Sequence, residues 1–179
     1  MKKIIFLILL IAITFAIPQK ANAMTRNESA QLSVPTADSI PTIDMRTKAL
    51  ENVFKRHNSP LTVEASAYIK YADQYGVDWK LLPAISGVES SFGIALMPDS
   101  YNAYGWGGGH IYFNSWEDGI RSIDEALGEN YYAKGATDVW KIGPIYAESP
   151  TWSVRVNGYM NEIEEEYERL TLFSNLPTI

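Results

Sequence analysis

One glutamate in this sequence stands where acid–base chemistry is expected. Glu89 follows Ile85 by four residues and precedes Phe92 by three, so on a helix its carboxyl group borders an apolar stripe. Partial burial disfavours the charged form of a carboxyl group, and a carboxyl group that keeps its proton can donate it to the leaving oxygen of a glycosidic bond. A glutamate at the edge of the core with its charge in water fits the same spacing. Position alone therefore makes Glu89 a candidate general acid and no more.

The segment that follows this glutamate combines glycine and aromatic residues and abandons helical spacing. Aromatic faces offer apolar area on which sugar rings stack, and their polar tips, together with Asn102, can orient hydroxyl and acetamido groups. Such rings also fill protein cores, and we expect about half of them to do so here, with Tyr112 and Phe113 first. The residues of interest between 93 and 114 are Tyr101, Tyr104, Gly105, Trp106, Gly107, Gly108, Gly109, Tyr112 and Phe113.

The first 23 residues have the three-part pattern of a secretory signal. Lys2 and Lys3 precede the apolar run 4–17, and small residues follow at 21–23. The run is shorter than the roughly 18 apolar residues expected of a membrane-spanning helix, which favours a cleaved signal over an uncleaved anchor. We therefore expect a protein that is secreted, periplasmic or associated with the cell wall, with no stable membrane span after cleavage.

The charge and cysteine content exclude several classes of protein. The chain has 15 basic and 21 acidic residues, and loss of the signal removes three lysines and no acid, leaving a net charge of −9. Nucleic acid is therefore not an expected partner. The absence of cysteine excludes disulfides, so stability must come from a packed core. His57 and His110 form no metal-ligand pattern, and we expect neither a metal nor another cofactor.

The remainder of the chain predicts a leader and one domain. Residues 24–42 are rich in Ser, Thr, Ala, Asn and Pro and predict a flexible leader. Over 43–174 apolar residues recur at helical spacing, which predicts a mainly α domain. The glycine- and aromatic-rich stretch within it predicts a long loop or a small β-hairpin beside the helix of Glu89.

Six helical stretches can be placed by their apolar positions. We take Asp78 and Thr137 as plausible N-caps, Ser115 as the start of a capping box, and Gly128 as a helix end. The four glutamates between 162 and 166 should lie largely on the wet face of the last helix. The stretches run from Met45 to Phe54, Ala65 to Tyr75, Leu81 to Phe92, Trp116 to Leu127, Val139 to Tyr146 and Trp152 to Leu170.

Four segments together resemble one known group of enzymes. Residues 85–92 resemble the Glu-Ser helix of the lysozyme-like superfamily, which includes lytic transglycosylases. Residues 102–106 resemble the Asn-x-Phe-Gly-Ile segment of the bacterial endo-β-N-acetylglucosaminidase family, the mannosyl-glycoprotein endo-β-N-acetylglucosaminidase-like enzymes. Residues 113–120 resemble its Phe-x-Ser-Trp-x-x-Ser-Ile helix start, and 146–152 its Tyr-Ala-x-Asp-Pro-x-Tyr segment. The order and spacing match, although Gly119 and Ser149 depart from the pattern.

The resemblance implies a lysozyme-like fold and cleavage of peptidoglycan glycan strands. It implies that Glu89 is the catalytic acid and that Tyr146 lies near the reacting sugar. The substrate contacts implied on the same basis are Ser90, Tyr101, Asn102, Tyr104, Trp106 and Trp152.

The second catalytic group is not identified by the sequence. Direct hydrolysis needs another carboxylate about 5–5.5 Å away for a retaining enzyme or about 6.5–9.5 Å for an inverting one. Asp99, Glu117 and Asp118 are the first three acids after Glu89, but a turn and a helix N-terminus account for them. If the acetamido group of the substrate attacks instead, Glu89 and Tyr146 suffice. Water then gives hydrolysis, and a sugar hydroxyl gives the anhydro product of a lytic transglycosylase.

Two readings from other classes remain open. One alternative is a glycan-binding module in which Glu89 only hydrogen-bonds the sugar, and the other is a surface interaction protein whose acidic last helix meets a partner. The fold alone does not choose among them, because one fold serves many functions.

Overall fold

The computed structural model describes residues 44–174. The expected signal 1–23 and leader 24–42 lie outside the described residues. The α-helices are α1 (Met45–Arg56), α2 (Ala65–Tyr75), α3 (Leu81–Ser90), α4 (Trp116–Asn130), α5 (Val139–Tyr146) and α6 (Trp152–Ser174), and the short 3-10 helices are η2 (Pro60–Glu64) and η3 (Tyr132–Lys134). The described part of the chain is thus mainly helical, as the spacing of apolar residues predicts.

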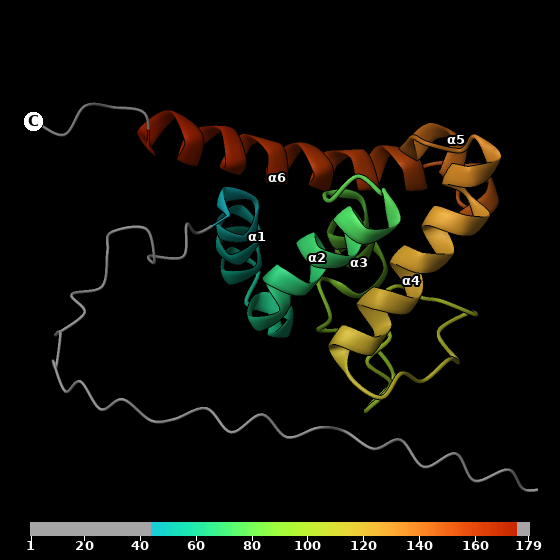
Figure 1. Ribbon diagram of the computed structural model, residues 1–179. Helices are drawn as coiled ribbons and strands as arrows, with labels where there is room; N and C mark the ends of the chain where they lie inside the picture. Colours follow the sequence, from blue (N-terminus) through green and yellow to red (C-terminus); the bar gives the residue numbers. More distant parts are fainter. Residues whose placement is uncertain (1–43, 175–179) are drawn as a thin grey trace, which may run out of the picture. The chain divides into compact units, whose positions relative to one another are not determined.

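The long helix α6 packs along both α1 and α3, while α2 packs against α4 (Figure 1). Gly87 permits the close approach of α6 to α3, because a Cβ at this position would lie 2.9 Å from the ring of Tyr159. The shared core has large side chains from every part of this arrangement, and each buried aliphatic or aromatic side chain contributes about 1.5–3 kcal/mol. The largest fully buried ones are Leu50, Phe54, Leu61, Tyr68, Leu81, Leu82, Ile85, Phe92, Tyr104, Ile120, Ile123 and Leu127.

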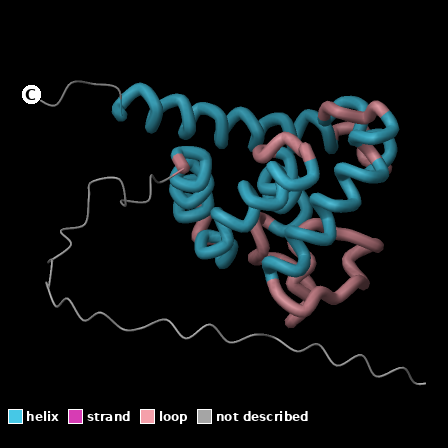
Figure 2. The backbone as a smooth tube through the Cα atoms, viewed as in Figure 1, coloured by secondary structure: helices cyan, strands magenta, loops and turns pink. Residues whose placement is uncertain are grey.

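The segment between α3 and α4 is a loop without a strand in the described residues, so the alternative of a small β-hairpin is wrong (Figure 2). Tyr104 is fully buried, whereas Tyr112 is 56% exposed, so the expectation that Tyr112 fills the core is also wrong. Phe113 is half-buried and packs against the core.

Two predicted N-caps are displaced by one or two residues. Asp78 lies before α3, where its side chain accepts from the backbone N–H of Lys80 (3.0 Å), and Lys80 is the N-cap. Pro83 then occupies the first turn of α3, where its missing N–H costs nothing. For α5, Asp138 rather than Thr137 is the N-cap, because its carboxylate accepts from the backbone N–H groups of Trp140 and Lys141. A charged acceptor is the stronger partner for a helix N-terminus.

One further expectation about helices is wrong and another holds only in part, both for tertiary reasons. Gly128 does not end its helix; α4 continues to Asn130, and a Cβ on Gly128 would lie 2.7 Å from the carbonyl oxygen of Tyr75. The glycine therefore allows α4 to pass close to the end of α2. In α6, Glu166 is only 6% exposed and not on a wet face, because Arg56 of α1 and Arg169 surround its carboxylate.

Among the described helices, none combines the length and apolar character needed to cross a membrane.

Candidate functional site

Glu89 lies in the last turn of α3, immediately before a sharp reversal of the chain. Ser91, Phe92 and Gly93 have φ of 52°, 58° and 80°, which end the helix at Ser90. Left-handed conformations cost non-glycine residues about 1–2 kcal/mol each. The buried ring of Phe92 and a hydrogen bond from Gly93 N–H to Ser90 Oγ (2.8 Å) offset that cost. No further turn of helix covers the carboxyl group as a result.

The two oxygens of the Glu89 carboxyl group have different surroundings. The indole Nε1–H of Trp152, the first residue of α6, donates a hydrogen bond of 2.7 Å to Oε1. Oε2 faces Gly105, where a Cβ would lie only 2.8 Å away. Within the described residues Oε2 accepts no hydrogen bond from the protein.

Glu89 is exposed, which corrects the expectation of a half-buried carboxyl group. It also lines none of four surface cavities found in the described part of the chain. The chain reversal after Ser90 removes the cover that a continuing helix would give. The side chain does not extend freely into solvent, however, because Trp152 and Gly105 contact its carboxyl group.

Hydrogen bonds from three side chains hold the loop segment 102–106 in place. One of these side chains, Asn102, belongs to the segment itself. Asn102 accepts from Trp106 N–H through Oδ1 (3.0 Å) and donates through Nδ2 to the carbonyl oxygen of Trp106 (2.9 Å). Ser90 Oγ donates to the carbonyl oxygen of Ala103 (2.8 Å), and the Tyr146 hydroxyl donates to that of Tyr104 (2.7 Å). These bonds fix the backbone on both sides of Gly105 and thus its position against Glu89.

An aromatic cluster of Trp106, Tyr131, Tyr146 and Trp152 lies beside this carboxyl group. Tyr146 is stacked on Trp152, with ring centroids 4.9 Å apart and planes inclined by 25°, and its centroid is 5.8 Å from that of Trp106. Burial, reinforced by the negative charge of Glu89, raises the pKa of Tyr146 well above its ordinary value. Tyr146 therefore stays protonated and keeps its hydrogen bond to the Tyr104 carbonyl.

The predicted substrate contacts fall into two groups. Ser90, Asn102, Tyr104 and Trp152 are buried, and their polar groups bond within the protein. Tyr104, for example, is fully buried with its hydroxyl 2.9 Å from that of Tyr68. The four buried residues therefore shape the site from within the protein. The other two, Tyr101 and Trp106, are half-buried, so part of each side chain is accessible at the surface. The ring of Tyr101 packs edge-on against Trp116 instead of joining the aromatic cluster.

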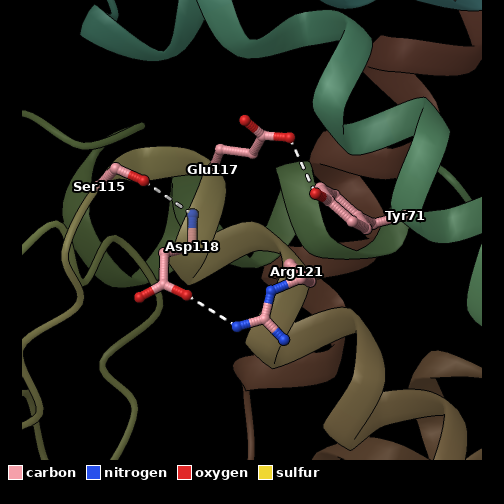
Figure 3. A pocket seen from close by; sticks show the side chains of 5 residues that line it. All are labelled: Tyr71, Ser115, Glu117, Asp118 and Arg121. Atoms are coloured by element: carbon pink, nitrogen blue, oxygen red, sulfur yellow. Dashed lines mark hydrogen bonds and ion pairs between the residues drawn. The ribbon is translucent and has the colours of Figure 1, made fainter.

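The first three acidic residues after Glu89 in the sequence, Asp99, Glu117 and Asp118, form no hydrogen bond with it in the described residues. Glu117 accepts from the hydroxyl of Tyr71 (2.8 Å), and Asp118 pairs with Arg121 (2.8 Å) in a pocket at the start of α4 (Figure 3). These hydrogen bonds lower the pKa of both acids. Asp99 is exposed, with a φ of 58°. The site thus has one identified carboxyl group.

The described residues contain no group of three or more His, Cys, Asp or Glu side chains arranged to hold a metal ion.

Sequence reasoning missed two residues that the structure brings into view. Gly105 contacts the carboxyl group of Glu89, and its place in a Tyr-Gly-Trp segment was the available signal. Arg155, exposed on α6, donates to the carbonyl oxygen of Val88 (3.3 Å), directly before Glu89. Nothing in the local sequence of Arg155 indicates this proximity.

No protein-family model matches the chain, and no curated protein matches it significantly.

Proposed function

We propose that this protein is an exported peptidoglycan glycosidase that cleaves a β-1,4 bond between amino sugars, with Glu89 as the general acid. The observation that supports the proposal best is the hydrogen bond from Trp152 to Oε1 of Glu89, which fixes the carboxyl group beside the aromatic cluster and leaves Oε2 free. Aromatic faces next to a positioned carboxyl group suit a sugar substrate. The four sequence motifs point to the same chemistry.

In this proposal Glu89 donates the proton that the leaving sugar needs. Oε2 transfers its proton to the glycosidic oxygen as the bond from that oxygen to the anomeric carbon breaks, so the leaving sugar departs as an alcohol. Trp152 holds the carboxyl group in one orientation and stabilises the negative charge that remains on it.

In the second half of the proposed reaction, the acetamido group of the substrate takes the role of the second catalytic group. The acetamido oxygen attacks the anomeric carbon as the glycosidic bond breaks and forms a cyclic intermediate. Water then opens this ring and returns a proton to Glu89, which gives net hydrolysis. Attack by the sugar's own hydroxyl gives an anhydro sugar instead and defines a lytic transglycosylase. Tyr146 acts as a positioning residue, since its hydroxyl is bonded to the Tyr104 carbonyl.

The test is digestion of purified peptidoglycan followed by mass analysis of the soluble fragments. The wild-type protein should release fragments, and Glu89→Gln should lower the rate at least about a hundredfold, the usual contribution of a general acid. Glu165→Gln is the matched control, because Glu165 is an exposed glutamate on α6. Release at the wild-type rate by Glu89→Gln would contradict the proposal. An anhydro ring in the product would identify the transglycosylase.

The exposure of Glu89 favours a second candidate, a glycan-binding module without catalysis. In that case the carboxylate accepts hydrogen bonds from sugar hydroxyls while the aromatic cluster supplies stacking. The same digestion separates the two candidate functions. A binding module sediments together with the insoluble peptidoglycan and releases no fragment from it.

A further inference from the structure

Arg155 differs from the other arginines of the described residues in its partners. Arg46, Arg56, Arg121 and Arg169 each form an ion pair with at least one carboxylate. Arg155 forms none within the described residues; its contact is the carbonyl oxygen of Val88. An exposed arginine without a carboxylate in a chain of net charge −6 is available to bind an external anion.

Arg155 lines a surface groove of about 310 Å³ together with Gly158, Tyr159 and Glu162 of α6. Gly158 leaves the floor open, because a Cβ at this position would meet nothing within 4 Å. The ring of Tyr159 is held by Phe92, with centroids 4.8 Å apart. The groove therefore has a fixed aromatic wall and an arginine at one end.

The negative charge of Glu162 in this groove is already compensated. Its Oε1 pairs with Arg56 (3.2 Å), and its Oε2 lies 3.1 Å from His57 Nε2. The guanidinium of Arg155 is thus the charged group of the groove without a partner carboxylate.

Arg155 links this groove to the residue that precedes the proposed catalytic group. Arg155 lies one helical turn after Trp152, whose indole binds Glu89, and its guanidinium contacts the residue preceding Glu89. A strand bound with its glycosidic oxygen at Glu89 would place a side branch within reach of α6. Peptidoglycan strands carry such a branch, a short peptide with free carboxylates.

On the basis of the proposed function, we infer that this groove binds the peptide branch of the peptidoglycan strand and that Arg155 recognises a carboxylate of that peptide. Arginine presents two parallel N–H donors, which match the two oxygens of a carboxylate. Tyr159 supplies the apolar wall for the peptide side chains. The groove would thus select peptide-bearing strands over bare amino-sugar polymers.

The experiment measures binding of a soluble disaccharide-tripeptide by calorimetry with the full chain. One probe has free peptide carboxylates, and in the other these carboxylates are amidated. The wild-type protein should bind the free form about tenfold more tightly, and Arg155→Gln should bind both forms equally, whereas Arg155→Lys should keep part of the preference. Lys134→Gln, which removes an exposed positive charge on η3, is the matched control and should keep all of it.

Equal binding of the two probes by the wild-type protein, or no binding of either, would overturn the inference, as would an unchanged preference in Arg155→Gln. Circular dichroism of each variant checks that the fold is retained. The proposed function fails separately, through fragment release that does not depend on Glu89. Carboxylate recognition at Arg155 without any release of fragments would describe a binding module.

Discussion

The indole nitrogen of Trp152 and Oε1 of Glu89 are 2.7 Å apart, although the two residues are separated by 63 positions in the sequence. This hydrogen bond joins the first residue of α6 to the last turn of α3. The Trp152 ring is itself fixed, because it is 2% exposed and stacked on Tyr146. A rigid donor of this kind holds the carboxyl group in one orientation, as a group that must meet a glycosidic oxygen requires.

Trp152→Phe removes the N–H donor but keeps an aromatic ring against Tyr146. We expect the rate of fragment release from peptidoglycan to fall about tenfold, a factor that corresponds to about 1.4 kcal/mol, the size of one hydrogen bond to a charged group. Stability should fall by about 1–2 kcal/mol because the smaller ring leaves space in the core. The matched control is Trp79→Phe, since Trp79 packs edge-on against Tyr167 and does not contact Glu89. Equal activity losses in both variants would show that the indole N–H has no special role.

Gly105→Ala should displace the Glu89 carboxyl group. Gly105 has a φ of 63°, so alanine adds about 1 kcal/mol of backbone strain, and its Cβ would stand 2.8 Å from Oε2. Gly109→Ala is a close control, because Gly109 has a φ of 80° and open space around a Cβ. Both variants should lose similar stability in thermal unfolding, and only Gly105→Ala should lose most of its activity. Full activity of Gly105→Ala would exclude a role for this contact.

Asp124→Asn tests a buried acid in α4. Asp124 is 1% exposed, neither of its carboxyl oxygens has a hydrogen-bond partner in the described residues, and burial raises its pKa well above the ordinary 3.8. The folded protein binds this proton more tightly than the unfolded chain does. The stability that the protonated Asp124 carboxyl group contributes is therefore complete below about pH 3.8, its ordinary pKa. This stability is lost as the pH rises toward the raised pKa of the folded state. The asparagine variant should therefore be more stable than the wild type at pH 7 and not at pH 3.5. Urea denaturation at both pH values measures this, and an equal difference at both would contradict it.

Glu166→Gln should destabilise the contact between α1 and α6. Hydrogen bonds from Arg169, followed by those from Asn52 and Arg56, lower the pKa of Glu166 to about 2. The ordinary value is 4.5, so the stability from this carboxylate is present above pH 4.5 and is lost as the pH falls toward 2. We expect a loss of about 2 kcal/mol at pH 7 and a smaller loss at pH 3, measured by urea denaturation. Glu165→Gln, on the exposed side of the same helix, should change little at either pH.

The helices could be predicted because each buries one face. Leu50, Val53 and Phe54 repeat at helical spacing, and all three are fully buried in α1. The start of α4 could also be predicted. Ser115 Oγ accepts a hydrogen bond from the backbone N–H of Asp118 (3.0 Å), as the capping pattern predicts. Periodicity and capping are local properties, and the sequence displays them directly.

The site could be predicted only in part because its contacts are not local. The motifs single out Glu89, Tyr146 and Trp152, but they do not show that the indole N–H of Trp152 points at the carboxyl group. The motifs also imply that Asn102 contacts the substrate. In the structure its side-chain amide forms hydrogen bonds with the backbone of Trp106 and so holds the loop. The conformation of a loop depends on which backbone groups find partners, and that is decided by the assembled fold.

The hydrogen bond between Trp152 and Glu89 has a consequence for a chain that is still being synthesised. During synthesis the ribosome adds Glu89 well before Trp152, so a growing or truncated chain already has its acidic group but lacks the indole that orients it. Fragments that end before α6 should therefore be inert toward peptidoglycan.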